Sequence, residues 1–125
     1  MGLTVLSAAG WPGDPFVRSR TPKGRAARRA SLPEAVRVLS PDAEEALTRL
    51  LFGGALDGLP MLSSWDPVGP PRYLRGSELD QVADEVGRAL ATPPTPDDGR
   101  AALAELVALV DHARRAGLLV VLLPD

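Results

Sequence analysis

The side chain best suited to acid–base chemistry near neutral pH is the single histidine of the chain, His112. It directly follows Asp111 and lies two helical turns after Glu105, so a carboxylate could orient its imidazole as a general base. No nucleophile motif accompanies it, and its position borders the polar face of a predicted helix. A partly exposed histidine near the negative end of a helix is therefore the preferred interpretation. A small enzyme that uses His112 is one alternative.

Other catalytic and metal chemistry finds little support in the residue types. The chain has no Cys and one His, which excludes thiolate catalysis, disulfides, cysteine-based metal sites and multi-histidine metal sites. No carboxylate spacing resembles a calcium loop, and no glycine pattern resembles a dinucleotide-binding or phosphate-binding loop. Several acids instead fit a solvated helix face: Glu78, Asp80, Asp84 and Glu85. The sequence predicts no catalytic residue, no metal and no cofactor.

A second group of residues has the types that dominate protein interfaces. Trp65, Asp66, Arg72 and Tyr73 lie close together in a stretch rich in Pro and Gly, and they include two of the five aromatic residues. If exposed together, they would form a protein-binding surface. The alternative is that Trp65 and Tyr73 close the end of a small core, with their polar tips at the surface.

The amino-terminal part of the chain could bind phosphate groups. Residues 1–37 carry seven basic and two acidic side chains, a net charge of +5, whereas residues 38–125 carry seven basic and fourteen acidic ones, a net charge of −7. The basic residues fall mainly in an irregular Pro- and Arg-rich segment, 10–34, where Arg25, Arg28 and Arg29 are candidate phosphate contacts. Arg28 and Arg29 also precede Ser31 in a pattern that basophilic kinases modify.

A nucleic-acid-associated protein that uses the basic 18–29 segment is the second alternative. The segment has no aromatic residues among its arginines for base stacking, and the rest of the chain is acidic. The abundance of arginine is not evidence for nucleic-acid binding. The chain has 13 Arg, one Lys and no Ile or Asn, a composition that indicates a GC-rich genome. We therefore expect a partner other than nucleic acid.

Three amphipathic helices must position these groups. The first helix is predicted over 41–52. Ser40 is a suitable N-cap, Pro41 suits the first helical position, and Asp42 places negative charge in the first turn. The two glycines at 53 and 54 end the helix. Apolar residues at spacings of three and four predict two more helices. The second has Ser77 as its N-cap and stops at Thr92, and the third opens at 95–98 and ends at Gly117.

A small sheet completes the predicted fold. The apolar run Leu118–Leu123 follows a helix stop and is too short for another helix, which predicts a strand buried on both faces. A strand needs partners, and 3–7 and 36–39 are the best candidates. Residues 55–72 predict a loop with short extended pieces. The predicted fold class is α+β, with three amphipathic helices packed on a small sheet that includes the C-terminal strand.

The chain is short enough for a single domain, 1–125, which contains the 10–34 segment. It has no apolar run of the roughly 18 residues that a membrane-spanning helix needs. Its amino terminus lacks the positive leader of a secretory signal. We therefore expect a cytoplasmic protein without a membrane partner.

The run Gly69–Leu79, GPPRYLRGSEL, resembles a signature that opens a helix in the YfbM-like domains of unknown function. Val38–Leu47 is similar to an early helix start of that family, and the last helix and apolar run are similar to its ending. The resemblance covers about 36–125; the 10–34 segment departs from it like an insertion, and 92–98 is shorter than the family's connection. It implies no catalytic residues and a protein-binding role of the immunity or accessory type. The first hypothesis is a non-enzymatic protein-binding module whose partner is another protein.

Overall fold

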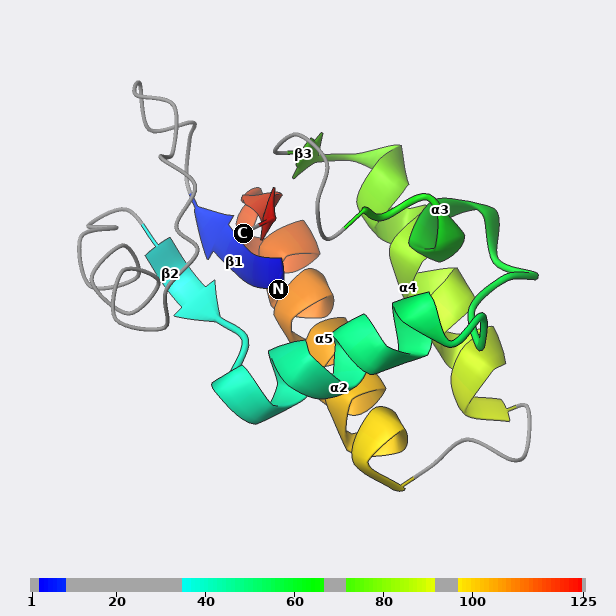
Figure 1. Cartoon of the computed structure of the whole chain (residues 1–125). Coiled ribbons are helices and arrows are strands. Elements are labelled where there is room, and N and C mark those ends of the chain that lie inside the picture. Colours follow the sequence, from blue (N-terminus) through cyan, green and yellow to red (C-terminus); the bar gives the residue numbers. More distant parts are fainter. Residues whose placement is uncertain (1–2, 9–34, 67–71, 92–96, 125) are drawn as a thin grey trace.

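A computed structural model describes residues 3–8, 35–66, 72–91 and 97–124. Within these ranges, the structure contains four helices and an antiparallel sheet of four strands (Figure 1). The strands are β1 (Leu3–Ala8), β2 (Ala35–Val38), β3 (Arg72–Leu74) and β4 (Leu119–Pro124). The helices are α2 (Pro41–Phe52), α3 (Pro60–Ser63), α4 (Ser77–Ala91) and α5 (Asp97–Ala116). The α+β prediction is confirmed, including the strand formed by the last apolar run.

The strand β4 is an inner strand of the sheet, whose order is β2-β1-β4-β3. It pairs with β1 from Leu3↔Pro124 to Ala8↔Leu119, and with β3 from Arg72↔Leu122 to Leu74↔Val120. Residues 120–123 are at most 2% exposed, so the prediction of a strand buried on both faces is also confirmed. An uninterrupted apolar run suits this place because neither face of the strand meets water.

The start of α2 and the end of α5 agree with their sequence signals, whereas Ser77, expected to cap the second helix, is the first residue of α4. The Ser40 hydroxyl accepts the backbone N–H of Ala43 at 3.2 Å, and Pro41 occupies the first turn of α2. At the other end of the chain, Gly117 has a φ of 69°, and the N–H of Leu118 returns to the carbonyl of Ala113 at 2.8 Å. The left-handed conformation of Gly117 therefore ends α5 and turns the chain into β4.

The helix α5 lies at the centre of the packing. It contacts α2, α4 and both central strands of the sheet. Gly99, at its start, lets α2 approach closely, because a Cβ atom there would lie 3.1 Å from a methyl group of Leu50. The alternating side chains of β4 divide between two clusters: Val120 and Leu122 join the core under the helices, whereas Val121 and Leu123 pack on the opposite face of the sheet.

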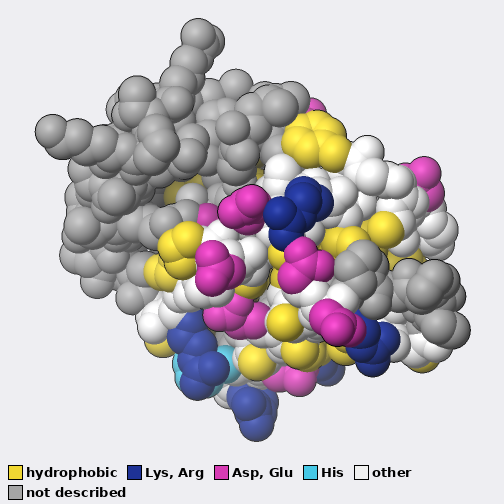
Figure 2. All heavy atoms as spheres, turned by 60° about the horizontal axis from the view of Figure 1, so that its bottom comes forward, with side chains coloured by type: hydrophobic (Ala, Val, Ile, Leu, Met, Phe, Trp, Pro, Cys, Tyr) yellow, Lys and Arg dark blue, Asp and Glu magenta, His cyan; other side chains and the backbone are white. Residues whose placement is uncertain are grey.

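Charged side chains link the helices at the surface, where acidic and basic groups are interspersed with hydrophobic ones (Figure 2). Arg49 pairs with Asp98, which joins the end of α2 to the start of α5. Arg114 pairs with Asp80 at 2.8 Å, which joins α5 to α4. These side chains are largely exposed, so each pair stabilises the fold by only about 0.2–1 kcal/mol.

Two short elements lie in the stretch predicted as a loop. The helix α3 lies within 55–72, and the strand β3 begins at the last residue of this stretch. Contacts from elsewhere in the chain fix both elements, because Glu85 accepts two backbone N–H groups of α3 and β3 pairs with β4. The prediction that Glu85 is solvated is therefore wrong, since its side chain is completely buried. The 10–34 segment, with Arg25, Arg28, Arg29 and the 18–29 alternative, lies outside the described residues.

Among the helices of the described ranges, none combines the length and the apolar character that crossing a bilayer requires.

Candidate functional site

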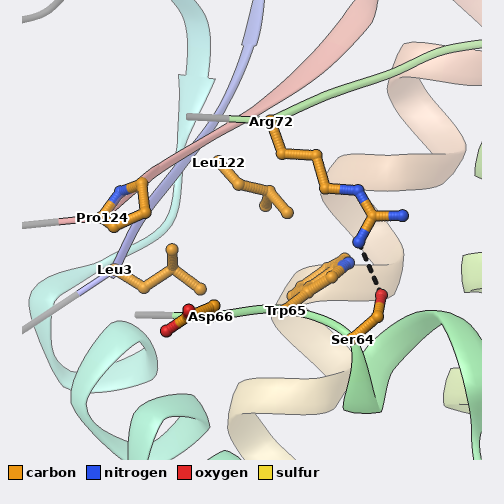
Figure 3. Close-up of a pocket in the computed structure, with 7 residues that line it drawn as sticks. All are labelled: Leu3, Ser64, Trp65, Asp66, Arg72, Leu122 and Pro124. Carbon is orange, nitrogen blue, oxygen red and sulfur yellow. Dashed lines mark hydrogen bonds between the residues drawn. The ribbon is translucent and has the colours of Figure 1, made fainter. Parts of the chain in front are cut away.

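A small pocket lies where β1 and β3 begin and β4 ends (Figure 3). Its volume is about 150 Å³, and it is lined by Leu3, Ser64, Trp65, Asp66, Arg72, Leu122 and Pro124. The strand register brings part of the lining together, because Arg72 is paired with Leu122 and Leu3 with Pro124. Side chains of paired residues lie on the same face of a sheet. The pocket therefore lies between the helix-covered face of the sheet and the 64–66 segment that follows α3.

The 64–66 wall of the pocket is held in place by a buried carboxylate on α4. Glu85 accepts the backbone N–H of Leu62 at 2.9 Å and that of Met61 at 3.0 Å, and the side-chain amide of Gln81 donates to it at 2.9 Å. These backbone groups belong to the first turn of α3, where no partner exists within the helix itself. Glu85 thus fixes the helix that leads directly into Ser64 and Trp65.

The charge of Glu85 is stabilised despite its burial. Burial alone would raise the pKa of its carboxyl group. The backbone N–H groups of Leu62 and Met61, the Gln81 amide and the positive charge of Arg88 outweigh this effect, so the pKa lies below the ordinary value for glutamate. Glu85 is therefore an ionised structural acid at neutral pH.

Arg72 supplies a cation at the mouth of the pocket. Its guanidinium donates to the Ser64 hydroxyl and contacts the Met61 sulfur at 3.3 Å, while the Ser64 hydroxyl donates to the Met61 carbonyl at 2.6 Å. Within the described part of the chain, Arg72 forms no ion pair with an acidic side chain. Two N–H groups are used in these contacts, and the others remain available as donors.

Trp65 contributes a buried hydrogen-bond donor. Its side chain is 4% exposed, and its indole nitrogen is buried without a hydrogen-bond partner among the residues that the structure describes. In Figure 3 this nitrogen points to the side of the pocket where the Arg72–Ser64 hydrogen bond lies. Buried Trp N–H groups usually find a partner, and leaving such a donor unpaired costs about 1–3 kcal/mol. An acceptor in the pocket would remove this cost.

The remaining lining is apolar on one side and acidic on the other. Leu3 and Leu122 are almost fully buried and form an apolar floor together with Pro124. The carboxylate of Asp66, an exposed residue, points toward Leu3 and Pro124 and away from the Trp65 nitrogen (Figure 3). The pocket thus has a donor end, made by Trp65 and Arg72, and an acidic end, made by Asp66.

Tyr73 does not share this pocket with the other three residues predicted for protein binding. It packs against the second apolar cluster, which contains Leu6 and Val121, on the face of the sheet away from the helices. The reason is the two-residue period of a strand, which turns Tyr73 and Arg72 to opposite faces. Burial raises the pKa of the Tyr73 hydroxyl. The structure therefore brings together Trp65, Asp66 and Arg72, and their role in binding stays a prediction.

His112 lies apart from this pocket, half-buried near the end of α5. Its Nδ1 atom is buried and has no hydrogen-bond partner in the described ranges. His112 does not line this pocket. It also does not line a second surface hollow, which is formed by Asp80, Asp111, Arg114 and Arg115. No group of three or more acidic or histidine side chains within the described residues could hold a metal ion. A catalytic role of His112 stays a prediction.

Comparisons with known proteins do not assign the chain to a family. No family model matches it, and no curated protein and no solved structure matches it. The similarity of the Gly69–Leu79 run to the YfbM-like domains therefore stays a prediction.

Proposed function

We propose that the protein is a non-enzymatic binding module that recognises another protein through the pocket between Trp65 and Arg72. The observation that supports this proposal is a pair of donors at one small pocket that have no acceptor among the residues the structure describes: the Trp65 indole N–H and part of the Arg72 guanidinium. Tryptophan and arginine are enriched among the residues that contribute most to the affinity of protein interfaces. Asp66, exposed beside them, provides a polar rim.

The size of the pocket favours a protein partner over a free small molecule. Pockets for drug-sized ligands and cofactors measure about 300–1,000 Å³, whereas this one measures about 150 Å³. A cavity of roughly this volume accommodates a molecule as small as benzene. One side chain of a docked protein fits such a space, and the surfaces around the pocket supply the remaining contact area. A role of this protein as an immunity-type or regulatory accessory protein is consistent with the resemblance of its sequence to the YfbM-like domains.

A matched pair of charge reversals tests the proposal. Arg72→Glu reverses the charge at the pocket, and Arg75→Glu makes the same change at an exposed position just beyond β3. Both variants and the wild-type chain are used to capture proteins from the native host, and any retained protein is purified and titrated against each chain. We expect one protein to bind the wild type and Arg75→Glu with equal affinity, and Arg72→Glu at least tenfold more weakly. Equal binding to all three chains would overturn the proposal.

A further inference from the structure

We infer that the group received by this pocket is the carboxylate of a glutamate or aspartate side chain on the partner protein. The inference rests on the proposed protein-binding function and names the chemistry of the contact. It follows from three features of the described residues: the donor-only character of Trp65, the unpaired charge of Arg72 and the apolar floor of the pocket.

The buried indole N–H restricts the ligand to a hydrogen-bond acceptor. An indole nitrogen can donate a hydrogen bond and cannot accept one. An ammonium or guanidinium group of the bound protein therefore could not form a hydrogen bond with the Trp65 nitrogen. The nitrogen has no acceptor among the described residues, and it points to the side on which the Arg72 guanidinium lies (Figure 3). An acceptor placed there would pair with a donor that the described residues leave without a partner.

The charge of Arg72 selects an anionic acceptor over a neutral one. Its planar guanidinium is suited to a carboxylate or a phosphate, both of which it can bind through two parallel hydrogen bonds. The contacts to Ser64 and Met61 fix the side chain before a ligand arrives, so little conformational freedom is lost on binding. A hydrogen bond between two charged groups is stronger than one to a neutral group, so Arg72 favours a carboxylate over a neutral amide.

The rest of the lining favours a side-chain carboxylate over a phosphate. Leu3 and Leu122 offer apolar contact for methylene groups, which a glutamate or aspartate side chain carries next to its carboxylate. The negative charge of Asp66 on the opposite wall repels a dianion about twice as strongly as a monoanion. A chain-terminal carboxylate is disfavoured because its own backbone and side chain would also have to fit into a space of about 150 Å³.

Propionate, which corresponds to the glutamate side chain, is the probe for this inference. The chain has two tryptophans, so the Trp11→Phe variant serves only to identify which indole N–H resonance of the ¹⁵N-labelled wild type belongs to Trp65. The wild type is then titrated with propionate, with its neutral isostere propionamide and with inorganic phosphate, at constant ionic strength. We expect the Trp65 resonance to shift saturably with propionate, with a Kd on the order of 1–10 mM.

Substitution of the cation completes the test. Arg72→Met is expected to weaken propionate binding roughly tenfold to hundredfold, whereas Arg75→Met leaves it unchanged. An unaltered Trp65 resonance in propionate, an equal response to propionamide, or tighter binding of phosphate would each overturn the inference. If Arg72→Glu abolishes partner binding while propionate has no effect, the carboxylate inference fails and the protein-binding proposal stands. If propionate binds but no partner depends on Arg72, the proposed function fails instead.

Discussion

The Glu85 carboxylate accepts the backbone N–H of Leu62 at 2.9 Å, although 23 residues separate them in the sequence. This contact joins α4 to α3 inside the core, where the Glu85 side chain is fully buried. A buried charge is tolerated only when hydrogen bonds compensate for the loss of hydration. The donors here are main-chain groups of a short helix, so the acid and the helix stabilise each other. The orientation of Trp65, three residues after Leu62, depends on this pair.

Replacing the acid with its amide should destabilise the protein. Glu85→Gln removes the charge and places an NH₂ group opposite one of the backbone donors, which leaves a buried N–H unpaired. We expect a loss of about 2–3 kcal/mol in the free energy of unfolding, measured by urea denaturation. Asp84→Asn, at the neighbouring exposed position, is the control and should change stability by less than about 0.5 kcal/mol. Equal effects of the two substitutions would contradict the role of Glu85.

Stability should also depend on pH through this residue. The pKa of Glu85 is lower in the folded protein than the ordinary value of about 4.3 expected for the unfolded chain. Its ionisation therefore stabilises the fold fully above that ordinary value, and the contribution is lost as the pH falls through the lower folded pKa. The difference in unfolding free energy between the wild type and Glu85→Gln should be constant from about pH 7 to 5 and shrink below about pH 4. A pH-independent difference would show that Glu85 is not charged in the fold.

Trp65 should reveal a conflict between stability and binding. Trp65→Phe keeps most of the buried aromatic surface and removes the unpaired N–H, so the melting temperature should stay within a few degrees of the wild type. Trp65→Ala leaves a cavity and should cost about 3–5 kcal/mol. Partner binding should nevertheless weaken at least tenfold in Trp65→Phe. Strong destabilisation by the phenylalanine variant would indicate that the indole nitrogen has a structural partner.

Two helical glycines should respond differently to the same substitution. Gly87 lies in α4 with nothing within 4 Å of the position that a Cβ would take, so Gly87→Ala should stabilise the protein by about 0.5–1 kcal/mol. At Gly99 the new Cβ would lie 3.1 and 3.3 Å from the two methyl groups of Leu50. Gly99→Ala should therefore gain less stability than Gly87→Ala, or lose some, because α2 must move. Thermal unfolding of both variants measures the difference, and equal gains would mean that the α2–α5 contact is loose.

Much of the fold could be predicted from the sequence because its signals are local. The Ser40 cap, the Gly117 terminator and the final apolar run each specify their own element. The short helix α3 could not be predicted, because contacts with Glu85 stabilise it more than its own residues do. The sequence predicts only short extended pieces near β3, because the strand β4 that pairs with it is distant in the chain. One signal was available for Glu85: it stands three residues after Val82, at the edge of the apolar stripe of α4.

The candidate site could be predicted in part for the same reason. Trp65, Asp66 and Arg72 are close in the sequence and line one pocket. Nothing local indicates that Leu3 and Pro124 would complete it, since these residues meet only through the pairing of β1 with β4. Tyr73 could have been separated from Arg72 if 72–74 had been recognised as a strand, because adjacent residues of a strand face opposite ways.

The pairing of Leu3 with Pro124 joins residues that are 121 positions apart. Contacts this distant in the chain slow folding, because a large loop must close before they form. While the polypeptide is being synthesised, Leu3 and Val5 are made before β4, the strand with which β1 pairs. Nascent chains that stop before residue 119 would therefore expose the hydrophobic side chains of β1 and its edge that normally pairs with β4. Such an edge is prone to aggregation and is of the kind that chaperones shield during synthesis.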